Sequence, residues 1–221
     1  MPETELKPLE IILATHNNYE MTAWCLKWLY ACTTETPFRL IVVDDSDDLT
    51  GAMLEDYNKR YGNLKVVRPE EKITNGNQII NAGLKATEGD IVCFMTNNTI
   101  VEPQWVCAAI DFMQGNENVG VMGFKLLKPG GAIEHAGIAF FPGMEHHVNY
   151  GVGEGANRHT YFRNIGIVGW ALVLLRRRAI PEGGLDEKTY HGFRGYDDID
   201  NCLTIQQNGW QIIYCGMGSA I

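Results

Sequence analysis

Residues 38–48 read FRLIVVDDSDD, an apolar run that ends abruptly in acidic residues. From Phe38 to Val43 only Arg39 is polar, which is typical of a strand covered on both faces in a parallel sheet. The run Asp44–Asp48 that follows is rich in residue types preferred in turns and at helix N-caps. The stretch therefore predicts a buried strand whose carboxyl end opens into a polar loop.

Similar apolar runs recur on both sides of this strand and alternate with segments of helical periodicity. Further strands are predicted at Glu10–Ala14, Leu64–Val67, Ile91–Met95 and Val119–Phe124. Helices are predicted at Tyr19–Ala31, Gly51–Tyr61, Asn75–Ala86 and Trp105–Met113. This alternation predicts an α/β fold with a mostly parallel, open, twisted sheet that is flanked by helices on both faces.

The second part of the chain has a different pattern. Between residues 128 and 164, Gly, His and aromatic residues interrupt short apolar runs, which indicates loops and hairpins rather than a separate domain. The last predicted elements are a strand at Ile167–Leu175, a helix at Tyr196–Asn208 and a strand at Trp210–Tyr214. With 221 residues and 45% hydrophobic content, the chain is predicted to form a single domain, residues 1–221.

Charge and composition argue against several classes of protein. The formal net charge is −9 and no run of Lys or Arg exceeds Arg176–Arg178, so nucleic-acid binding is not expected. The N-terminal Met-Pro-Glu-Thr-Glu has two acidic residues and no basic one, and no apolar stretch approaches the roughly 20 residues of a spanning helix, so neither a signal peptide nor a membrane span is expected. The six cysteines form no C-x-x-C pair, which favours reduced thiols in a cytoplasmic protein.

Three polar clusters are predicted at carboxyl ends of strands, where open parallel sheets bind their ligands. They follow Ala14, Val43 and Met95. Carboxylates of the second cluster can accept hydrogen bonds from a nucleobase or a ribose, and helix capping is the alternative. The third cluster, Thr96-Asn97-Asn98, has amide oxygens but no carboxylate. It would therefore hold a divalent cation only weakly, and an ordinary Asn-rich turn is the alternative.

A fourth cluster places Asp197, Asp198 and Asp200 at the start of a predicted helix. Like charges this close can raise the pKa of one carboxyl, which would suit a general base that takes a proton from a hydroxyl group. Capping and compensation of the helix dipole are the alternative. Because successive residues on a helix differ in direction by about 100°, the three carboxylates cannot all face one small site.

Taken in order, these segments resemble family 2 glycosyltransferases of the GT-A fold, and the resemblance spans nearly the whole chain. Ile11–Asn18 and Val42–Ser46 resemble the family's opening strand and its nucleotide-binding segment. Asn75–Gly83 with Gly89-Asp90 is similar to the helix before the family's metal strand. The other matching segments are Gly131–Gly137, which is similar to rhamnosyltransferase-like members, Val168–Ala171, Gly184–Glu187 and Asp197–Asp200.

The resemblance implies direct transfer of a sugar, with inversion, from a nucleoside-diphosphate sugar to a carbohydrate or lipid-linked acceptor in polysaccharide biosynthesis. A lipid-linked acceptor would bring the protein to the membrane surface. Residues 1–125 would bind the nucleotide, and residues 126–221 would hold the acceptor and the catalytic base, Asp198. The implied nucleotide-binding residues are Ala14, Thr15, His16, Asn17, Asp44, Asp45, Asn77, Asn81, Thr96 and Asn97. The implied supporting residues are Gly169, Trp170, Asp197 and Asp200.

Two departures from the family's pattern concern the metal. The D-x-D motif falls on Thr96-Asn97-Asn98, so Asn98 stands where a ligand aspartate would be, and the metal-binding His that often follows the last strand would lie beyond Ile221. Both weaken the expectation of a bound Mg²⁺ or Mn²⁺. A weakly active or inactive nucleotide-sugar-binding module is therefore an alternative. A sugar nucleotidyltransferase is a second alternative, against which the lack of a Gly-rich phosphate loop counts.

Overall fold

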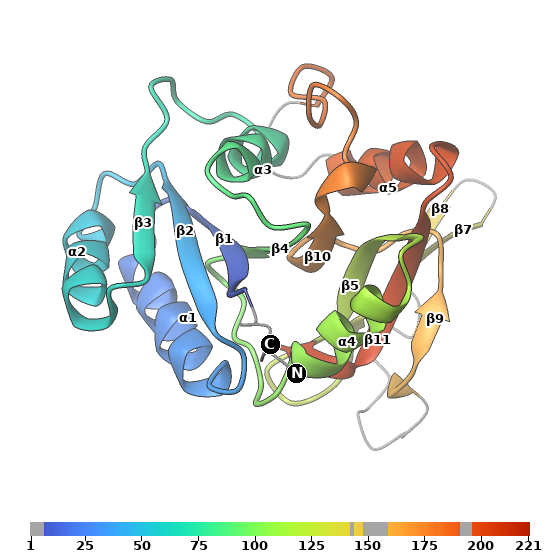
Figure 1. Cartoon of the computed structure of the whole chain (residues 1–221), viewed down its shortest axis with the longest axis horizontal. Coiled ribbons are helices and arrows are strands. Elements are labelled where there is room, and N and C mark those ends of the chain that lie inside the picture. The colour runs from blue at the N-terminus through green and yellow to red at the C-terminus, as the bar shows by residue number, and fades with distance from the viewer. Residues whose placement is uncertain (1–6, 142–143, 148–158, 191–195) are drawn as a thin grey trace, which may run out of the picture.

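The computed structural model describes residues 7–141, 144–147, 159–190 and 196–221. Within these ranges a sheet of nine strands forms the centre of the molecule (Figure 1). Its strands are β1 (Leu9–Thr15), β2 (Phe38–Asp44), β3 (Leu64–Val67), β4 (Ile91–Thr96), β5 (Val119–Leu127), β6 (Ile133–His135), β9 (Phe162–Asn164), β10 (Leu172–Arg176) and β11 (Gln211–Ala220).

Most strands of the sheet run in the same direction. Strands β3, β2, β1 and β4 lie side by side in that order and pair in parallel. Strand β10 pairs antiparallel with both β4 and β5, and β11 pairs parallel with β5. Strands β6 and β9 add antiparallel pairs to β5 and β11. A separate hairpin joins β7 (Ile138–Phe141) to β8 (Met144–His147).

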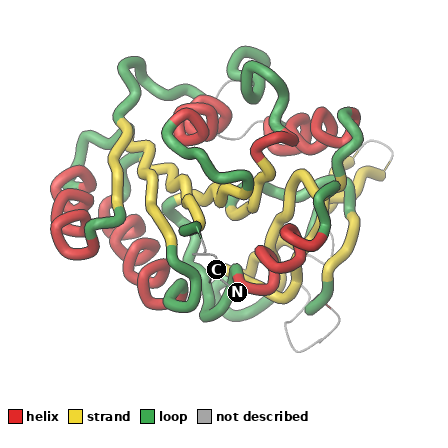
Figure 2. Tube along the Cα trace, viewed as in Figure 1, coloured by secondary structure: helices red, strands yellow, loops and turns green. Residues whose placement is uncertain are grey.

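Helices cover both faces of the sheet, as predicted. One face packs against α1 (Tyr19–Cys32), α2 (Thr50–Tyr61) and α4 (Cys107–Gly115). The other face packs against α3 (Gly76–Lys85), α5 (Asp197–Gln207) and the short 3-10 helix η2 (Arg177–Ala179). Figure 1 shows α3 and α5 above the sheet and α1 and α4 below it, and Figure 2 shows the strands as one layer between the helices. The predicted α/β fold, with an open, mostly parallel sheet between two layers of helices, is therefore confirmed.

The prediction was wrong about the start of one strand. Strand β10 begins at Leu172, so residues 167–171 of the predicted strand Ile167–Leu175 lie outside the sheet. They look like a strand in sequence because Ile167 and Val168 are buried in the core. The Val168 side chain packs directly over Gly123 of β5, where a β-carbon would lie only 2.5 Å from it. An apolar run can therefore reflect burial without strand pairing.

The remaining predictions agree with the structure to different extents. The helix predicted at Trp105–Met113 begins two residues later, at Cys107. Short strands and the β7–β8 hairpin occur between residues 128 and 164, as expected, although residues 142–143 and 148–158 lie outside the described residues. The N-terminal residues for which no signal peptide was expected also lie outside them. No helix in the described ranges combines the length and apolar character needed to cross a membrane.

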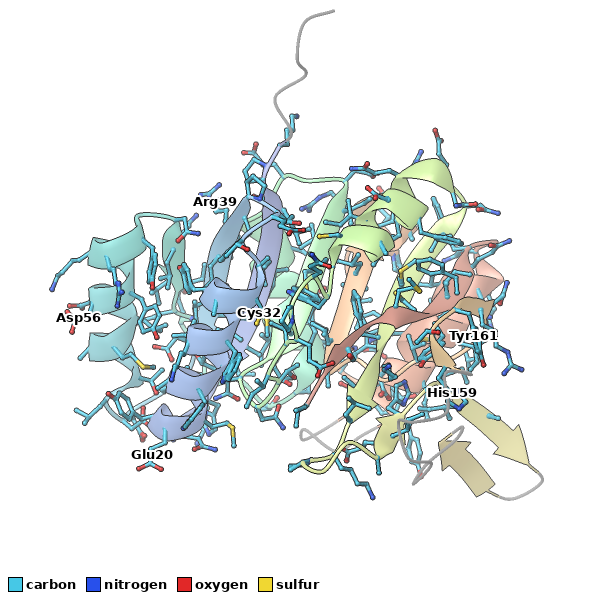
Figure 3. All side chains as sticks on the ribbon, turned by 90° about the horizontal axis from the view of Figure 1, so that it is seen from below. Glu20, Cys32, Arg39, Asp56, His159 and Tyr161 are labelled. Atoms are coloured by element: carbon cyan, nitrogen blue, oxygen red, sulfur yellow. The ribbon has the colours of Figure 1, made fainter. Side chains whose placement is uncertain are left out.

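The parallel strands bring their carboxyl ends to one edge of the sheet. In Figure 3, Glu20 at the start of α1 and Arg39 at the start of β2 lie at opposite ends of this layer. The chain turns sharply after β1 through Asn17 and Asn18, with φ of 55° and 62°. Asn is among the few residue types that tolerate this left-handed conformation. The β1–α1 turn therefore lies at the same edge as the ends of β2 and β4.

Candidate active site

A cleft of about 530 Å³ lies at this edge, between the carboxyl ends of β1 and β4 and the N-terminal ends of α3 and α5. It contains residues from three of the four predicted clusters. The lining residues are Ala14, Thr15, His16, Asn18, Gly76, Asn77, Ile79, Ile80, Phe94, Thr96, Asn97, Asn98, Trp170, Ala171, Asp197, Asp198 and Asn201. A polar cleft at strand ends is the arrangement that open α/β sheets use for ligands.

The wall formed by β1 is held rigidly by the neighbouring loops. Thr15 donates its hydroxyl hydrogen bond to Asp44 Oδ1 at 2.9 Å. The Nδ1 of His16 lies 3.0 Å from the carbonyl oxygen of Asp45 and 3.6 Å from its carboxylate. The Asn17 side chain accepts a hydrogen bond from the backbone N–H of Asp47 at 2.9 Å. These contacts fix the shape of the β1–α1 turn before any ligand binds.

Asp44, the last residue of β2, and Asp45, which follows it, do not line the cleft. Asp44 is 3% exposed, and its Oδ2 lies 3.5 Å from Nη2 of Arg68. Asp45 is more accessible, with 23% of its side chain exposed, and it accepts a weak hydrogen bond from the backbone N–H of Ile73 at 3.3 Å. Of the two carboxylates, that of Asp45 is the more accessible to a ligand, and it lies 3.6 Å from Nδ1 of His16, which lines the cleft.

The end of β4 presents neutral groups. The Asn97 side chain donates hydrogen bonds to Thr22 Oγ1 at 2.8 Å and to the carbonyl of Asn17 at 3.2 Å, so it ties β4 to α1. The exposed Asn98 accepts a hydrogen bond from the Thr96 hydroxyl at 2.6 Å. Thr96 and Asn98 are therefore hydrogen-bonded to each other. Both line the cleft, and their side-chain oxygens carry no formal charge.

The two asparagines of α3, Asn77 and Asn81, form hydrogen bonds with other residues of the protein. Asn77 lines the cleft, donates to the carbonyl of Asp186 at 2.8 Å and exchanges side-chain hydrogen bonds with Asn201. Asn81 is not among the lining residues. Its amide donates to the carbonyl of Leu185 and to Glu187 at 2.9 and 2.7 Å, and its oxygen accepts from Leu185 N–H. Both residues therefore anchor the 185–187 segment to α3.

The three carboxylates at the start of α5 point to different surroundings. Asp197 faces the first turn of α3, since a β-carbon on Gly76 would lie 3.0 Å from its Oδ2. The positive end of a helix stabilises a carboxylate in such a place. Asp198 faces the other way, with its Oδ2 beside Gly169, and both Asp197 and Asp198 line the cleft. Asp200 does not line it and instead accepts a hydrogen bond from Tyr190.

The floor of the cleft lies next to Asp198 and is apolar. Trp170 is 6% exposed, lines the cleft and donates its indole hydrogen bond to Cys202 Sγ at 3.3 Å. Burial, partly offset by this hydrogen bond, raises the pKa of the Cys202 thiol to about 11. The thiol is therefore neutral at ordinary pH and adds no negative charge beside Asp198.

The fit of a divalent cation can be judged from the oxygens at the strand ends. Mg²⁺ and Mn²⁺ prefer oxygen ligands, of which carboxylates are the usual protein source. Thr96 and Asn98 offer only neutral oxygens that already bond each other. No group of three or more His, Cys, Asp or Glu that could hold a metal occurs in the described part of the chain. These residues do not fit a tightly held resident cation.

Several residues that line the cleft were not predicted from the sequence. Asn201 follows the acidic cluster by one residue and lies on the helix face of Asp198, so the spacing of three residues was an available signal. Gly76 falls within the predicted helix Asn75–Ala86 and was not singled out as a site residue. The apolar lining residues Ile79, Ile80 and Phe94 have no signal in the sequence beyond that of a core residue.

Comparison of this chain with known proteins identifies the family to which it belongs. The family model described as glycosyl transferase family 2 matches residues 10–184. The uncharacterised protein y4gI of Sinorhizobium fredii is 26% identical over 219 residues, which cover 93% of this chain and 23% of that protein. The O-antigen biosynthesis protein RfbC of Myxococcus xanthus is 34% identical over 118 residues, which cover 50% of this chain and 9% of that protein.

A solved structure supports the GT-A type that was predicted for the fold. The crystal structure of GalNAc-T7 with UDP, GalNAc and Mn²⁺ superposes with a TM-score of 0.77 at 13% identity, over 96% of this chain and 42% of that chain. This chain therefore spans less than a quarter of either sequence relative and less than half of this structural one. The rhamnosyltransferase-like subgroup stays a prediction. The family model matches most of the sequence, and the chain belongs to glycosyl transferase family 2.

Proposed function

We propose that the chain transfers a sugar from a nucleoside-diphosphate sugar to an acceptor hydroxyl, with inversion at the anomeric carbon. The observation that carries this proposal is the cleft, which sets Asp198 across from the polar ends of β1 and β4. Family membership supports a glycosyltransferase, and the GalNAc-T7 structure, which shares the fold, contains UDP. One wall would then hold the nucleotide and the other would act on the acceptor.

The proposed mechanism is a single displacement. Asp198 takes the proton of the acceptor hydroxyl as its oxygen attacks the anomeric carbon. The bond from that carbon to the diphosphate breaks on the opposite face, and the diphosphate leaves with the electron pair. Of the two carboxylate oxygens, Oδ1 accepts a hydrogen bond from the N–H of Ile199 at 2.8 Å, and Oδ2 would receive the acceptor's proton.

On the nucleotide side, the proposed contacts come from the ends of β1, β2 and β4. Asp45 would bind the base or ribose, and the turn after Ala14 would line the nucleotide. A divalent cation, where one takes part, would be held chiefly by the anionic oxygens of the donor's diphosphate, with Asn98 as a neutral ligand. Asn77 and Asn81 would shape this half by holding α3 to residues 185–187.

On the acceptor side, Gly169 and Trp170 would form the floor, with Asp197 and Asp200 in supporting roles. A carbohydrate acceptor, free or linked to lipid, and a place in polysaccharide biosynthesis fit the similarity to an O-antigen biosynthesis protein. A lipid-linked acceptor would bring the protein to the cytoplasmic side of a membrane. Residues 1–125 and 126–221 would then serve as nucleotide and acceptor halves of one domain.

The test is turnover of a panel of UDP-, GDP-, TDP- and CDP-sugars with carbohydrate acceptors. Release of a nucleoside diphosphate together with a product of inverted anomeric configuration, assigned by NMR, is the expected result. The neutral strand end at Thr96–Asn98 favours one second candidate, a module that binds nucleotide-sugars without turnover. Tight binding of a donor by calorimetry, with no transfer to any acceptor, would establish that module and refute the proposed enzyme.

A further inference from the structure

Two buried asparagines, Asn77 of α3 and Asn201 of α5, are hydrogen-bonded to each other, and the mechanism above does not use this pair. Nδ2 of Asn77 donates to Oδ1 of Asn201 at 3.2 Å, and Nδ2 of Asn201 donates to Oδ1 of Asn77 at 2.8 Å. Asn77 is 1% exposed and Asn201 is 4% exposed, and both line the cleft. The pair therefore joins two helices on the same side of the sheet (Figure 1) inside the candidate site.

A third group fixes the orientation of both amides. Nδ2 of Asn77 also donates to the carbonyl oxygen of Asp186 at 2.8 Å. A carbonyl oxygen only accepts hydrogen bonds, so the nitrogen of the Asn77 amide must face it and the oxygen of Asn77 must accept from Asn201. The nitrogen of Asn201 must then face that oxygen. The pair therefore has a single arrangement in which all three hydrogen bonds form.

Contacts from two directions hold α5 about its own axis. Asn77 holds Asn201, and Trp170 holds the next residue, since its indole N–H donates to Sγ of Cys202 at 3.3 Å. Successive residues on a helix differ in direction by about 100°, so the two contacts restrain α5 from different sides. Asp198 precedes Asn201 by three residues and therefore lies on the same face of the helix. The two contacts together fix the direction in which Asp198 leaves α5.

We propose that the Asn77–Asn201 pair positions the base, by setting the rotation of α5 that presents Asp198 to the acceptor. This inference rests on the proposed function. A helical side chain ends about 5 Å from the helix axis, so a rotation of α5 by about 10° moves the carboxylate by about 1 Å. A misplacement of about 1 Å can lower a rate by about 100-fold. The two amides are neutral and neither takes nor gives a proton during transfer.

Asn201→Ala tests the positioning role because it removes the pair from the α5 side. Its kcat, referred to the concentration of folded protein, should fall by about 10- to 100-fold. Its affinity for the donor, measured by calorimetry, should stay near the parental value, since the proposed nucleotide contacts come from the ends of β1, β2 and β4. A pair with a merely structural role would lower stability and leave the kcat of folded protein unchanged, which would overturn the proposal.

The matched control is Asn75→Ala, which removes a buried asparagine from the same helix. The Asn75 side chain donates to the carbonyl of Glu187 at 2.8 Å and accepts from the backbone N–H of Gln78 at 3.1 Å. Neither bond reaches α5, and Asn75 does not line the cleft. This variant should lose stability in urea but keep kcat near the parental value. Equal losses of kcat in Asn75→Ala and Asn201→Ala would overturn the proposal, because kcat would then follow the stability of α3.

A double-mutant cycle tests whether the two amides act as one unit. Asn77→Ala should lower kcat, and adding Asn201→Ala to it should lower kcat little further, because the effects of residues in direct contact are coupled. Losses that multiply in the double variant would show two independent effects and would overturn the proposal.

A measurement without turnover separates this proposal from the proposed function. In ¹H–¹⁵N NMR of the parent chain, the side-chain N–H of Asn201 that bonds Asn77 should exchange slowly with solvent, and Asn77→Ala should accelerate the exchange. Fast exchange in the parent chain, which needs no variant, or exchange that ignores Asn77→Ala, would overturn the pair even where transfer occurs. Slow exchange in a parent chain without transfer would instead refute the proposed function, and the positioning role with it.

Discussion

Asn98 stands at the exposed mouth of the cleft, where a carboxylate would restore the charge that the strand end lacks. Asn98→Asp should therefore tighten binding of Mn²⁺ in the complex with a nucleoside diphosphate. The substitution keeps the shape of the side chain. The introduced carboxylate can still accept the hydrogen bond that Thr96 donates to Asn98, so the new charge should occupy the same position.

The size of the effect follows from the exposure of the site. Two unit charges about 4 Å apart attract by about 1 kcal/mol in water, so a divalent cation gains about 2 kcal/mol. Because 1.4 kcal/mol is a factor of ten, this corresponds to roughly 30-fold tighter binding. The effect should shrink at high salt, since exposed charges are screened.

The assay is a titration of Mn²⁺ followed by electron paramagnetic resonance, with saturating nucleoside diphosphate. The matched control is Asn58→Asp on α2, which adds the same charge at an exposed position outside the cleft. Equal Mn²⁺ affinity in Asn98→Asp and the control would show that Asn98 does not face the cation. Low-micromolar binding of Mn²⁺ to the parent chain without nucleotide would contradict the weak site altogether.

Three further predictions concern the nucleotide, the anchoring of α3 and pH. Asp45→Ala should weaken nucleotide binding by about tenfold or more, as expected for loss of a charged hydrogen bond, and unchanged affinity by calorimetry on a folded variant would refute the contact. Asn81→Ala strands the backbone groups of Leu185 and should lower the free energy of unfolding by about 1–3 kcal/mol in urea; an unchanged midpoint would contradict the anchoring role. Burial raises the thiol pKa of Cys25 to about 12 and of Cys202 to about 11, against 9.0 when exposed. Stability should therefore be fully present below about pH 9 and fall as pH rises toward 12, which urea titrations at stepwise pH can check against the less sensitive Cys202→Ala.

Much of the fold was predictable because parallel strands buried on both faces have continuous apolar sequences. The strand Leu64–Val67 has the bounds that the sequence predicts, and β2 is longer by only Asp44. The antiparallel insertion of β10 between β4 and β5 was not predictable, because periodicity indicates a strand but not its partner. The start of β10 was misplaced because Val168 is buried over Gly123 without belonging to the sheet.

Residues of the candidate site were predictable where a cluster of polar residues directly follows a strand or begins a helix. Thr15, Thr96 and Asp198 all line the cleft, as their positions after strands or at a helix start suggested. The interactions between clusters were not predictable. The hydrogen bonds that Gly137 and Gly169 donate to Nε2 of His135 join β6 to the segment before β10, and no local sequence pattern predicts such a long-range contact. Likewise, Asn81 matches a family segment, yet its hydrogen bonds run to Leu185 and Glu187.

The central claim is that Asp198 is the base of an inverting sugar transfer, and Asp198→Asn tests it most directly. This substitution keeps the shape and removes the ability to take a proton, so turnover should fall by roughly 10²–10⁴-fold. Donor affinity by calorimetry should change little, because the base acts on the acceptor. Asp200→Asn, on the same helix but outside the cleft lining, should lose far less. Near-parental transfer by Asp198→Asn, measured as product formed with the preferred donor, would contradict the claim.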